Sequence, residues 1–141
     1  MALKILMSAG EASGDRLGAG LVRAIRRRRG DVDVLGMGGA EMAAAGVRLV
    51  ANTEEVAVMG LFEVLSHLPA IRRAMARLEE ALATERPDLV VPIDFPEFNL
   101  KLAASAKRAG IPVVYFVSPQ IWAWRRGRIR KIRTSLAMKH A

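Results

Sequence analysis

Short apolar runs alternate with amphipathic stretches along most of the chain. The runs are rich in Val, Ile and Leu, and they have the length and composition of strands buried on both faces of a sheet. The strands predicted from these runs are Leu3–Ala9, Val32–Leu35, Val47–Val50, Leu89–Ile93 and Val113–Val117.

Between the runs, apolar residues recur every three or four positions, which is the period of an amphipathic helix. The two clearest stripes are Leu17-Leu21-Ile25 and, after Pro69, Ile71-Met75-Leu78-Leu82. Two more helices are expected at 40–45 and from Pro96 to about 109, since Gly46 and Gly110 follow them where glycine commonly ends a helix. Ser13 or Asp15 is expected to cap the first long helix.

This alternation of strand and helix predicts an α/β fold with a mostly parallel sheet and helices on both faces. In such sheets, ligands bind in the crevice beyond the carboxyl ends of the strands. Four loops are predicted at that edge: Gly10–Asp15, Gly36–Gly39, Asp94–Asn99 and Ser118–Trp124.

The first loop places glycines and Ser13 at the start of a helix, where free N–H groups attract anions. Glu11 and Asp15 oppose a bare phosphate, so a hydroxyl-rich ligand such as a sugar fits at least as well. The alternative is a capping turn without a ligand. The loop lacks the P-loop lysine, which excludes a Walker A nucleotide site, and Gly36–Gly39 is interpreted as a tight turn.

Asp94 is the most informative carboxylate in the sequence. It follows the apolar run 89–93, so it is expected to project from a buried strand into the crevice, where desolvation would raise its basicity. The alternative is that Asp94 only caps the helix that begins at Pro96. Trp122 and Trp124 are compatible with a core, a sugar-stacking platform or an interface.

Composition excludes several classes of protein. The 141 residues are 52% hydrophobic and 26% charged, which is typical of a globular chain with a core. There is no cysteine, which excludes disulfides, cysteine-ligated zinc and a cysteine nucleophile, and two histidines, His67 and His140, are too few for a multi-histidine metal site. The apolar runs are far shorter than the ~20 residues of a membrane span, so the expected location is the cytoplasm.

The net charge of +8 comes from two basic segments. Arg26–Arg29 holds four cations and Arg125–Arg133 holds six, so the remainder carries 8 − 10 = −2. Such patches suit phosphates, an anionic membrane or nucleic acid. The first patch is also explained as a solvated helix end, where cations complement the helix dipole.

Four motifs occur in order over 8–131: Ser8–Asp15 with Gly18-Ala19, Val58–Leu65, Ile93–Asn99 and Val117–Arg125. Together they resemble the N-terminal half of the lipid-A-disaccharide synthase family. The resemblance implies a Rossmann-like domain, residues 1–141, as the acceptor-side half of a GT-B fold. It also implies that a C-terminal UDP-sugar-binding domain is absent from this sequence. Such a fragment, truncated product or split enzyme is not expected to complete the reaction alone.

The resemblance implies an inverting hexosyltransferase that joins UDP-2,3-diacylglucosamine to 2,3-diacylglucosamine 1-phosphate through a β-1,6 bond and releases UDP, without a metal or cofactor. Asp94 matches the family's proposed general base. The substrate-binding residues expected from the motifs are Gly10, Glu11, Ser13, Gly14, Asp15, Met59, Asn99, Ser118, Gln120 and Trp122.

The resemblance also implies peripheral contact with the anionic inner membrane from the cytoplasmic side. The residues expected to make that contact are Val58, Leu61, Phe62, Leu65, Arg125, Arg126 and Arg128. A separate C-terminal half is a further expected partner. Nucleic acid is not expected, because the second basic segment has no interleaved aromatic residues. The alternative function is a non-catalytic basic module that binds an anionic membrane or nucleic acid.

Overall fold

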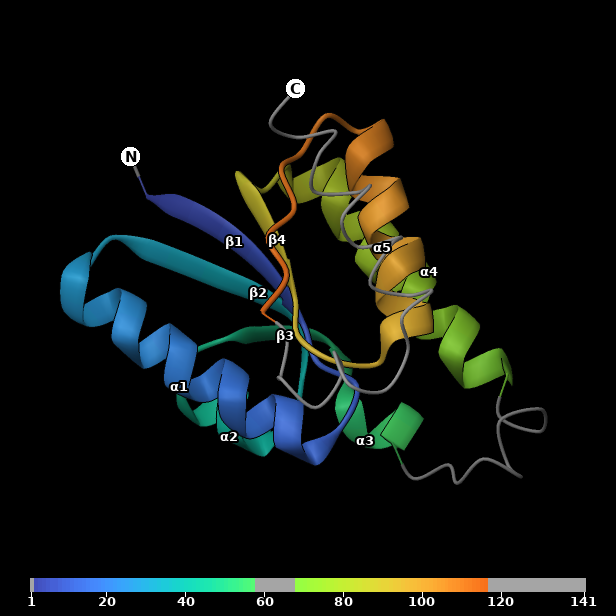
Figure 1. Cartoon of the computed structure of the whole chain (residues 1–141), viewed down its shortest axis with the longest axis horizontal. Helices are drawn as coiled ribbons and strands as arrows, with labels where there is room; N and C mark the ends of the chain where they lie inside the picture. Colours follow the sequence, from blue (N-terminus) through green and yellow to red (C-terminus); the bar gives the residue numbers. More distant parts are fainter. Residues whose placement is uncertain (1, 58–67, 117–141) are drawn as a thin grey trace.

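The computed structural model describes residues 2–57 and 68–116, which form a four-stranded parallel sheet and its covering helices (Figure 1). The sheet order is β3-β2-β1-β4, and every described pairing is parallel. The strands are β1 Leu3–Ser8, β2 Val32–Gly38, β3 Arg48–Asn52 and β4 Leu89–Pro92. The helices are α1 Ala12–Arg28, α2 Ala40–Ala44, α3 Thr53–Ala57, α4 Leu68–Glu85 and α5 Pro96–Arg108. The predicted α/β fold is confirmed.

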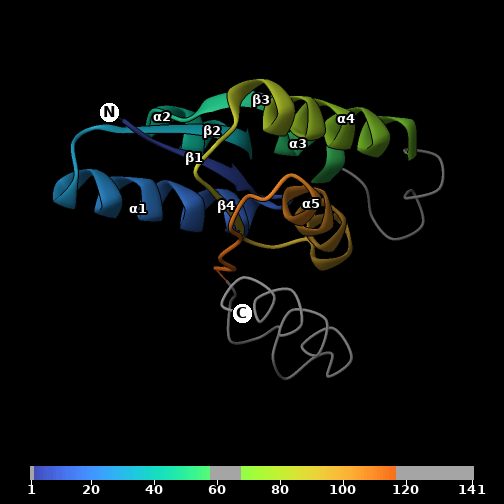
Figure 2. The same ribbon diagram turned by 90° about the horizontal axis from the view of Figure 1, so that it is seen from above.

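The sheet is buried on both faces. Alternate residues of β1 point to opposite sides, so Ile5 and Met7 pack with α1 and α2 while Leu6 packs with α4 and α5. Seen from above, α1 and α4 lie on opposite sides of the strands (Figure 2). This double burial explains why the strands read as nearly continuous apolar runs. Within the described ranges, no helix is long and apolar enough to span a membrane.

The bounds of two predicted strands differ clearly from the structure: the strand expected at Val47–Val50 is Arg48–Asn52, and the second strand is longer than expected. The strand expected at 32–35 continues to Gly38, so Gly36–Gly39 is mostly strand and not a tight turn. Gly36 has φ +142°, and a Cβ there would overlap the carbonyl of Met7 on the neighbouring strand, so glycine permits the close approach of β2 to β1.

The strand expected at 113–117 is described only to residue 116 and is less regular than predicted. A single bridge pairs Val113 with Val90 of β4. The N–H groups of Val114 and Phe116 donate to the carbonyls of Val90 and Pro92 at 2.9 and 3.0 Å. The segment therefore runs parallel to β4 at the edge of the sheet without forming a full ladder.

The expectation that Ser13 or Asp15 caps its own helix is also wrong. The N-cap of α1 is Glu11, and its side chain makes no capping hydrogen bond. Asp15 lies one turn inside α1, is buried, and caps α2 instead. Its carboxylate accepts hydrogen bonds from the N–H groups of Gly39 (2.8 Å), Met42 (2.9 Å) and Glu41 (3.0 Å). The free N–H groups at the start of α2 attract this charge.

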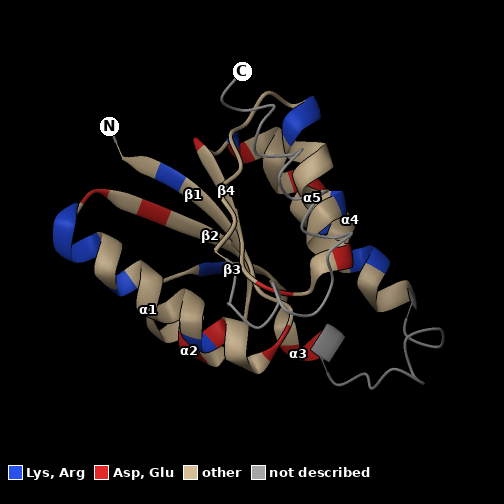
Figure 3. Ribbon diagram, in the orientation of Figure 1, with Lys and Arg blue, Asp and Glu red and all other residues tan. Residues whose placement is uncertain are grey.

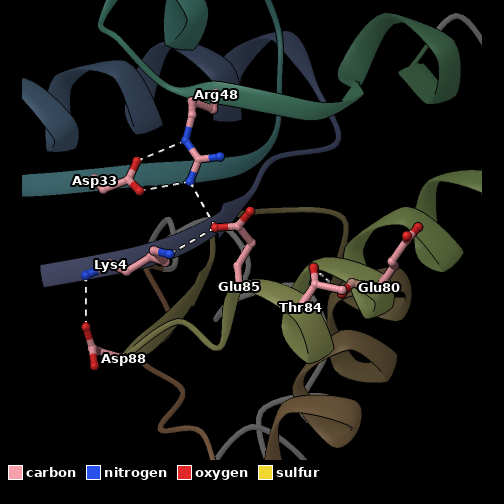
Figure 4. A network of polar contacts seen from close by, with 7 residues as sticks. All are labelled: Lys4, Asp33, Arg48, Glu80, Thr84, Glu85 and Asp88. Carbon is pink, nitrogen blue, oxygen red and sulfur yellow. Dashed lines mark hydrogen bonds and ion pairs between the residues drawn. The ribbon is translucent and has the colours of Figure 1, made fainter.

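A network of exposed charges joins the strands at their amino ends (Figure 4). Arg48 of β3 pairs with Asp33 of β2 at 2.8 Å and with Glu85 of α4 at 3.2 Å, and Glu85 also pairs with Lys4 of β1 at 2.9 Å. The hydrogen bonds that Arg48 donates to Asp33 and then to Glu85 raise the pKa of its guanidinium group. These side chains remain accessible to solvent, where ion pairs contribute little to the stability of the fold.

The run Arg26–Arg29 lies at the C-terminal end of α1, at the same amino edge of the sheet (Figure 3). Arg26 donates to the carbonyls of Ala45 (2.5 Å) and Gly46 (3.3 Å) just after α2, and Arg29 pairs with Asp31 at 2.9 Å. Arg26 therefore binds the end of α2 and Arg29 pairs with an exposed acid, which favours the interpretation of the run as a solvated helix end. At about 1.5 Å per residue, the length of α1 separates this run from the carboxyl edge by roughly 25 Å.

We predict that Asp15→Asn destabilises the fold by about 1–3 kcal/mol, because an amide offers one acceptor oxygen to three N–H donors and buries an unmatched NH₂ group. Urea unfolding measures the change. The matched control is Asp31→Asn, which removes an exposed charge paired with Arg29 and should cost less than about 1 kcal/mol. Equal losses for the two variants would contradict the capping role of Asp15.

Candidate active site

Two of the predicted loops meet at the carboxyl edge of the sheet. β1 and β4 are neighbours, with Ser8 opposite Pro92, and the N–H of Ile93 donates to the carbonyl of Ser8 at 2.9 Å. The loop that follows β1 therefore lies directly beside the loop that follows β4. This adjacency places Asp94 against the start of α1, although 83 residues separate Glu11 from Asp94 in the sequence.

The Asp94 carboxylate binds the backbone at the start of α1. Its Oδ1 accepts from the N–H of Gly10 at 2.5 Å, and its Oδ2 accepts from the N–H of Glu11 at 3.0 Å. The N-cap of α5 is Phe95, and no side chain caps that helix. The alternative interpretation of Asp94 as the cap of the following helix is therefore wrong.

Two glycines make room for this arrangement. A Cβ on Gly14 would overlap the Asp94 carboxylate, and a Cβ on Gly10 would overlap the ring of Phe95. The small residues of the first loop therefore allow a close approach between the two loops. This close approach accounts for the glycines, so a bound phosphate is not needed to explain their presence.

The environment of Asp94 raises the pKa of its carboxyl group to about 6. Burial is the main cause, because a desolvated carboxylate is less stable than the neutral acid, and the charge of Glu11 adds to it. The N–H groups of Gly10 and Glu11 act in the opposite direction. The result is a carboxylate that is mostly ionised at neutral pH yet more basic than an ordinary aspartate, as a general base requires.

Phe95 adopts the left-handed conformation, with φ +52° and ψ +65°. This geometry costs a non-glycine residue roughly 1–2 kcal/mol, and the ring is stacked on Phe98 with centroids 5.3 Å apart. Pro96 disfavours the right-handed helical region for the residue that precedes it, but nothing in the sequence pattern indicates the left-handed turn. That turn directs the chain from Asp94 into α5.

The described substrate-binding candidates divide into exposed and buried residues. Glu11, whose N–H binds Asp94, and Ser13 are exposed, whereas Gly10, Gly14, Asp15 and Asn99 are buried. The Asp15 side chain is engaged with α2, and the Asn99 amide donates to the carbonyls of Ser8 (3.1 Å) and Asp94. The other substrate-binding candidates lie outside the described residues: Met59, Ser118, Gln120 and Trp122. The residues expected to contact the membrane also lie outside them: Val58, Leu61, Phe62, Leu65, Arg125, Arg126 and Arg128.

Sequence reasoning missed one buried polar group near this edge. Thr53, at the start of α3, is 3% exposed and donates its hydroxyl to the carbonyl of Ala9 at 2.6 Å. Its partner is distant in the sequence, so no local pattern could identify it. In residues 2–57 and 68–116, no three His, Asp or Glu side chains cluster as a metal site requires. The geometry instead suits proton removal from a hydroxyl group placed beside Asp94.

Comparison with known proteins shows which family this chain is similar to. Residues 5–138 match the profile of the lipid-A-disaccharide synthetase family. The chain is 52% identical over 130 residues to the lipid-A-disaccharide synthase of Myxococcus xanthus, covering 92% of this chain and 34% of that protein. It is 53% identical over 130 residues to the enzyme of Syntrophotalea carbinolica, covering 92% of this chain and 33% of that protein.

A solved structure shares the fold. The glycosyltransferase SnogD from Streptomyces nogalater aligns with a TM-score of 0.56 and 19% identity, over 99% of this chain and 41% of that one. The chain spans about a third of the length of the curated relatives that it matches. With its matched motifs and its Rossmann-like half of a glycosyltransferase fold, the chain belongs to the lipid-A-disaccharide synthetase family.

Proposed function

We propose that this chain forms the acceptor-side half of a lipid-A-disaccharide synthase. The complete enzyme transfers the diacylglucosamine of UDP-2,3-diacylglucosamine to 2,3-diacylglucosamine 1-phosphate. Family membership supports this reaction, and the observation that carries it is the desolvated Asp94 carboxylate at the carboxyl edge of the sheet, with its pKa raised to about 6. A carboxylate of that basicity suits the removal of a proton from a sugar hydroxyl.

In the proposed mechanism, Asp94 accepts the proton of the acceptor's 6-hydroxyl as that oxygen attacks the anomeric carbon of the donor. The new carbon–oxygen bond forms while the bond to UDP breaks, and the leaving diphosphate carries away the electron pair. The anomeric centre is inverted, which gives the β-1,6 linkage. The N–H groups of Gly10 and Glu11 hold the carboxylate in a fixed direction during the transfer.

Further substrate contacts are proposed around Asp94. Glu11 and Ser13 are exposed at the N-terminus of α1 and offer polar groups to sugar hydroxyls. Met59, Ser118, Gln120 and Trp122 are proposed to complete the acceptor site on the strength of the family motifs. A second domain, either on the same chain or as a separate C-terminal half, is proposed to hold the UDP group.

Peripheral membrane contact is also proposed, from the cytoplasmic side of the anionic inner membrane. Its support is the lipid nature of the proposed substrates and the apolar and basic residues at Val58–Leu65 and Arg125–Arg128. α4 begins directly after the first of these segments, and Arg72 and Arg73 are exposed in its early turns. Cations near a membrane surface add about 1 kcal/mol each to binding.

We predict that Asp94→Asn, made in a chain that also carries the second domain, lowers kcat by ~10²–10⁴-fold, because the amide cannot accept the proton. KM should change much less, since the proton moves only in the transition state. Asp88→Asn is the matched control, since Asp88 is a carboxylate at the opposite edge of the sheet that accepts from the backbone of Lys4. Near-normal turnover by Asp94→Asn would falsify the assignment and leave Glu11, Asp15 and Glu97 as the nearby acids.

The pH dependence of kcat/KM provides a separate prediction. A general base works when deprotonated, so the rate should rise with pH through about 6 and then level off, following the raised pKa of Asp94. The rise should disappear from the residual activity of Asp94→Asn. A midpoint near the ordinary aspartate value of about 4 would mean that Asp94 is not desolvated in the free enzyme.

For the membrane, we predict that the protein sediments with vesicles of phosphatidylglycerol and phosphatidylethanolamine and that salt weakens this binding. Reversing Arg125, Arg126 and Arg128 to Glu should reduce the binding constant by ~10²-fold or more, because each cation contributes about 1 kcal/mol. The control reverses three exposed arginines of α1, Arg23, Arg27 and Arg28, and has the same net charge.

Equal losses in the two triple variants would show that net charge alone controls vesicle binding, with no oriented basic surface. Binding that is insensitive to salt and to both reversals would contradict the electrostatic contribution and identify the apolar segment as the anchor.

A further inference from the structure

We propose that Asn99 is a positioning residue that fixes the direction of the Asp94 carboxylate and does not bind substrate. The proposal deepens the role of the same site, and its catalytic consequence rests on the proposed function of Asp94. It replaces the substrate-binding role that the sequence motif suggested for Asn99. The observations behind it are the hydrogen bonds of the Asn99 amide, its burial and the backbone conformation of the turn that it holds.

The Asn99 amide is committed to two backbone acceptors. Its Nδ2 donates to the carbonyl of Ser8 at 3.1 Å and to the carbonyl of Asp94. Both partners are acceptors, so the NH₂ group must face them, and the opposite orientation of the amide would set three oxygens against one another. Both N–H bonds of the group are therefore used inside the protein.

These hydrogen bonds link the end of β1 to the segment 93–99. The carbonyl of Ser8 accepts both the N–H of Ile93 and the Asn99 amide, so the segment 93–99 is tied at both ends to one atom of β1. Gly10, two residues after Ser8, donates in turn to the Asp94 carboxylate. The position of that carboxylate relative to α1 thus depends on a chain of contacts that passes through Asn99.

The turn at Phe95, between Asp94 and α5, needs such a restraint. Phe95 has φ +52°, an unfavourable value for a residue with a side chain, and the Asp94 carbonyl that Asn99 holds belongs to the peptide just before it. Rotation of this peptide towards an ordinary conformation would turn the Asp94 side chain away from Gly10. The Asn99 amide opposes that rotation, while the first bond of α5, from the Asn99 N–H to the Phe95 carbonyl at 3.0 Å, fixes the other end of the turn.

Burial excludes direct contact between Asn99 and a sugar in this conformation. The residue is 1% exposed, and its Oδ1 is buried without a hydrogen-bond partner among the described residues. The Ser8 hydroxyl has the same status, and Ser8 lies on the same face of β1 as Leu6, which packs with Leu102 of α5. Both unpaired atoms are therefore buried on the side of β1 that α5 covers.

The first test uses the unmodified chain and NMR. If Asn99 holds the turn, its two Nδ2 protons should exchange with solvent much more slowly than those of a solvent-exposed asparagine side chain. The amide protons of Gly10 and Glu11 should shift with the same midpoint as the Asp94 carboxyl carbon, near pH 6. Nδ2 protons that exchange as fast as those of a solvent-exposed asparagine would overturn the proposal, and this result does not depend on whether any variant folds.

The second test is Asn99→Ala. Loss of the restraint should admit water to Asp94, so its titration midpoint should fall by at least one pH unit towards the ordinary value of about 4. The response of the Gly10 amide to that titration should fall by at least half. The matched control is Ser105→Ala, which removes a polar group of α5 that donates to exposed Glu79, and it should leave both observations unchanged. An unchanged Asp94 titration in a folded Asn99→Ala would overturn the proposal.

The third test measures kinetics in a chain that carries the second domain. Asn99→Ala should lower kcat by ~10²-fold, the typical effect of misplacing a catalytic group by about 1 Å, and should shift the acidic limb of the pH profile to lower pH. KM should stay within about threefold. A raised KM with unchanged kcat would identify Asn99 as a substrate ligand and overturn the positioning role.

The two roles can fail separately. If Asp94→Asn retains activity while Asn99→Ala still shifts the Asp94 titration, then the general-base assignment is wrong and Asn99 nevertheless positions that carboxylate. If Asp94→Asn is inactive while the Asp94 titration is unchanged in Asn99→Ala, then the general-base assignment stands and the positioning role of Asn99 is wrong.

Discussion

The hydrogen bonds from the Gly10 and Glu11 backbone to the Asp94 carboxylate are the contact on which the site depends. They join the ends of two neighbouring parallel strands. They require that no side chain lie between the Asp94 carboxylate and the backbone at the start of α1. The glycines at 10 and 14, the pairing of β1 with β4 and the left-handed turn at Phe95 all serve this one approach. The same contact keeps Asp94 partly buried, so a structural constraint also sets its proton affinity.

Two aspartates accept hydrogen bonds from backbone N–H groups, for different purposes. Asp15 accepts three N–H groups at the start of α2 and is 6% exposed, so its carboxylate is shielded from solvent and holds α1 and α2 together. Asp94 accepts two N–H groups, keeps more exposure and has a raised pKa. A carboxylate with unused acceptor positions next to solvent can take a proton from a ligand, whereas one surrounded by backbone donors serves the fold.

Local pattern was enough to predict the parallel α/β architecture, most strands and helices, and the position of Asp94 after a buried strand. It failed where the decisive partner is distant in the sequence. Asp15 has a side chain that favours helix starts, but the helix that it caps begins 25 residues later at Ala40. Gly36 was interpreted as part of a turn because the carbonyl of Met7, which requires the glycine, belongs to another strand. The motif that contains Asn99 likewise does not show that the amide of this residue donates to the carbonyl of Ser8, 91 residues earlier in the sequence.

The distribution of charge suggests how the proposed reaction is divided between domains. At the carboxyl edge, the carboxylates of Glu11 and Asp94 lie together, and Glu11 adds to the raised pKa of Asp94. Negative charge here disfavours a diphosphate and accommodates a neutral hydroxyl that must lose a proton. The Arg26–Arg29 run cannot compensate, because it lies at the far end of α1 and partly binds carbonyls there. This charge distribution supports the proposed acceptor-side role, in which the leaving diphosphate would need positive charge or backbone N–H groups from another part of the enzyme.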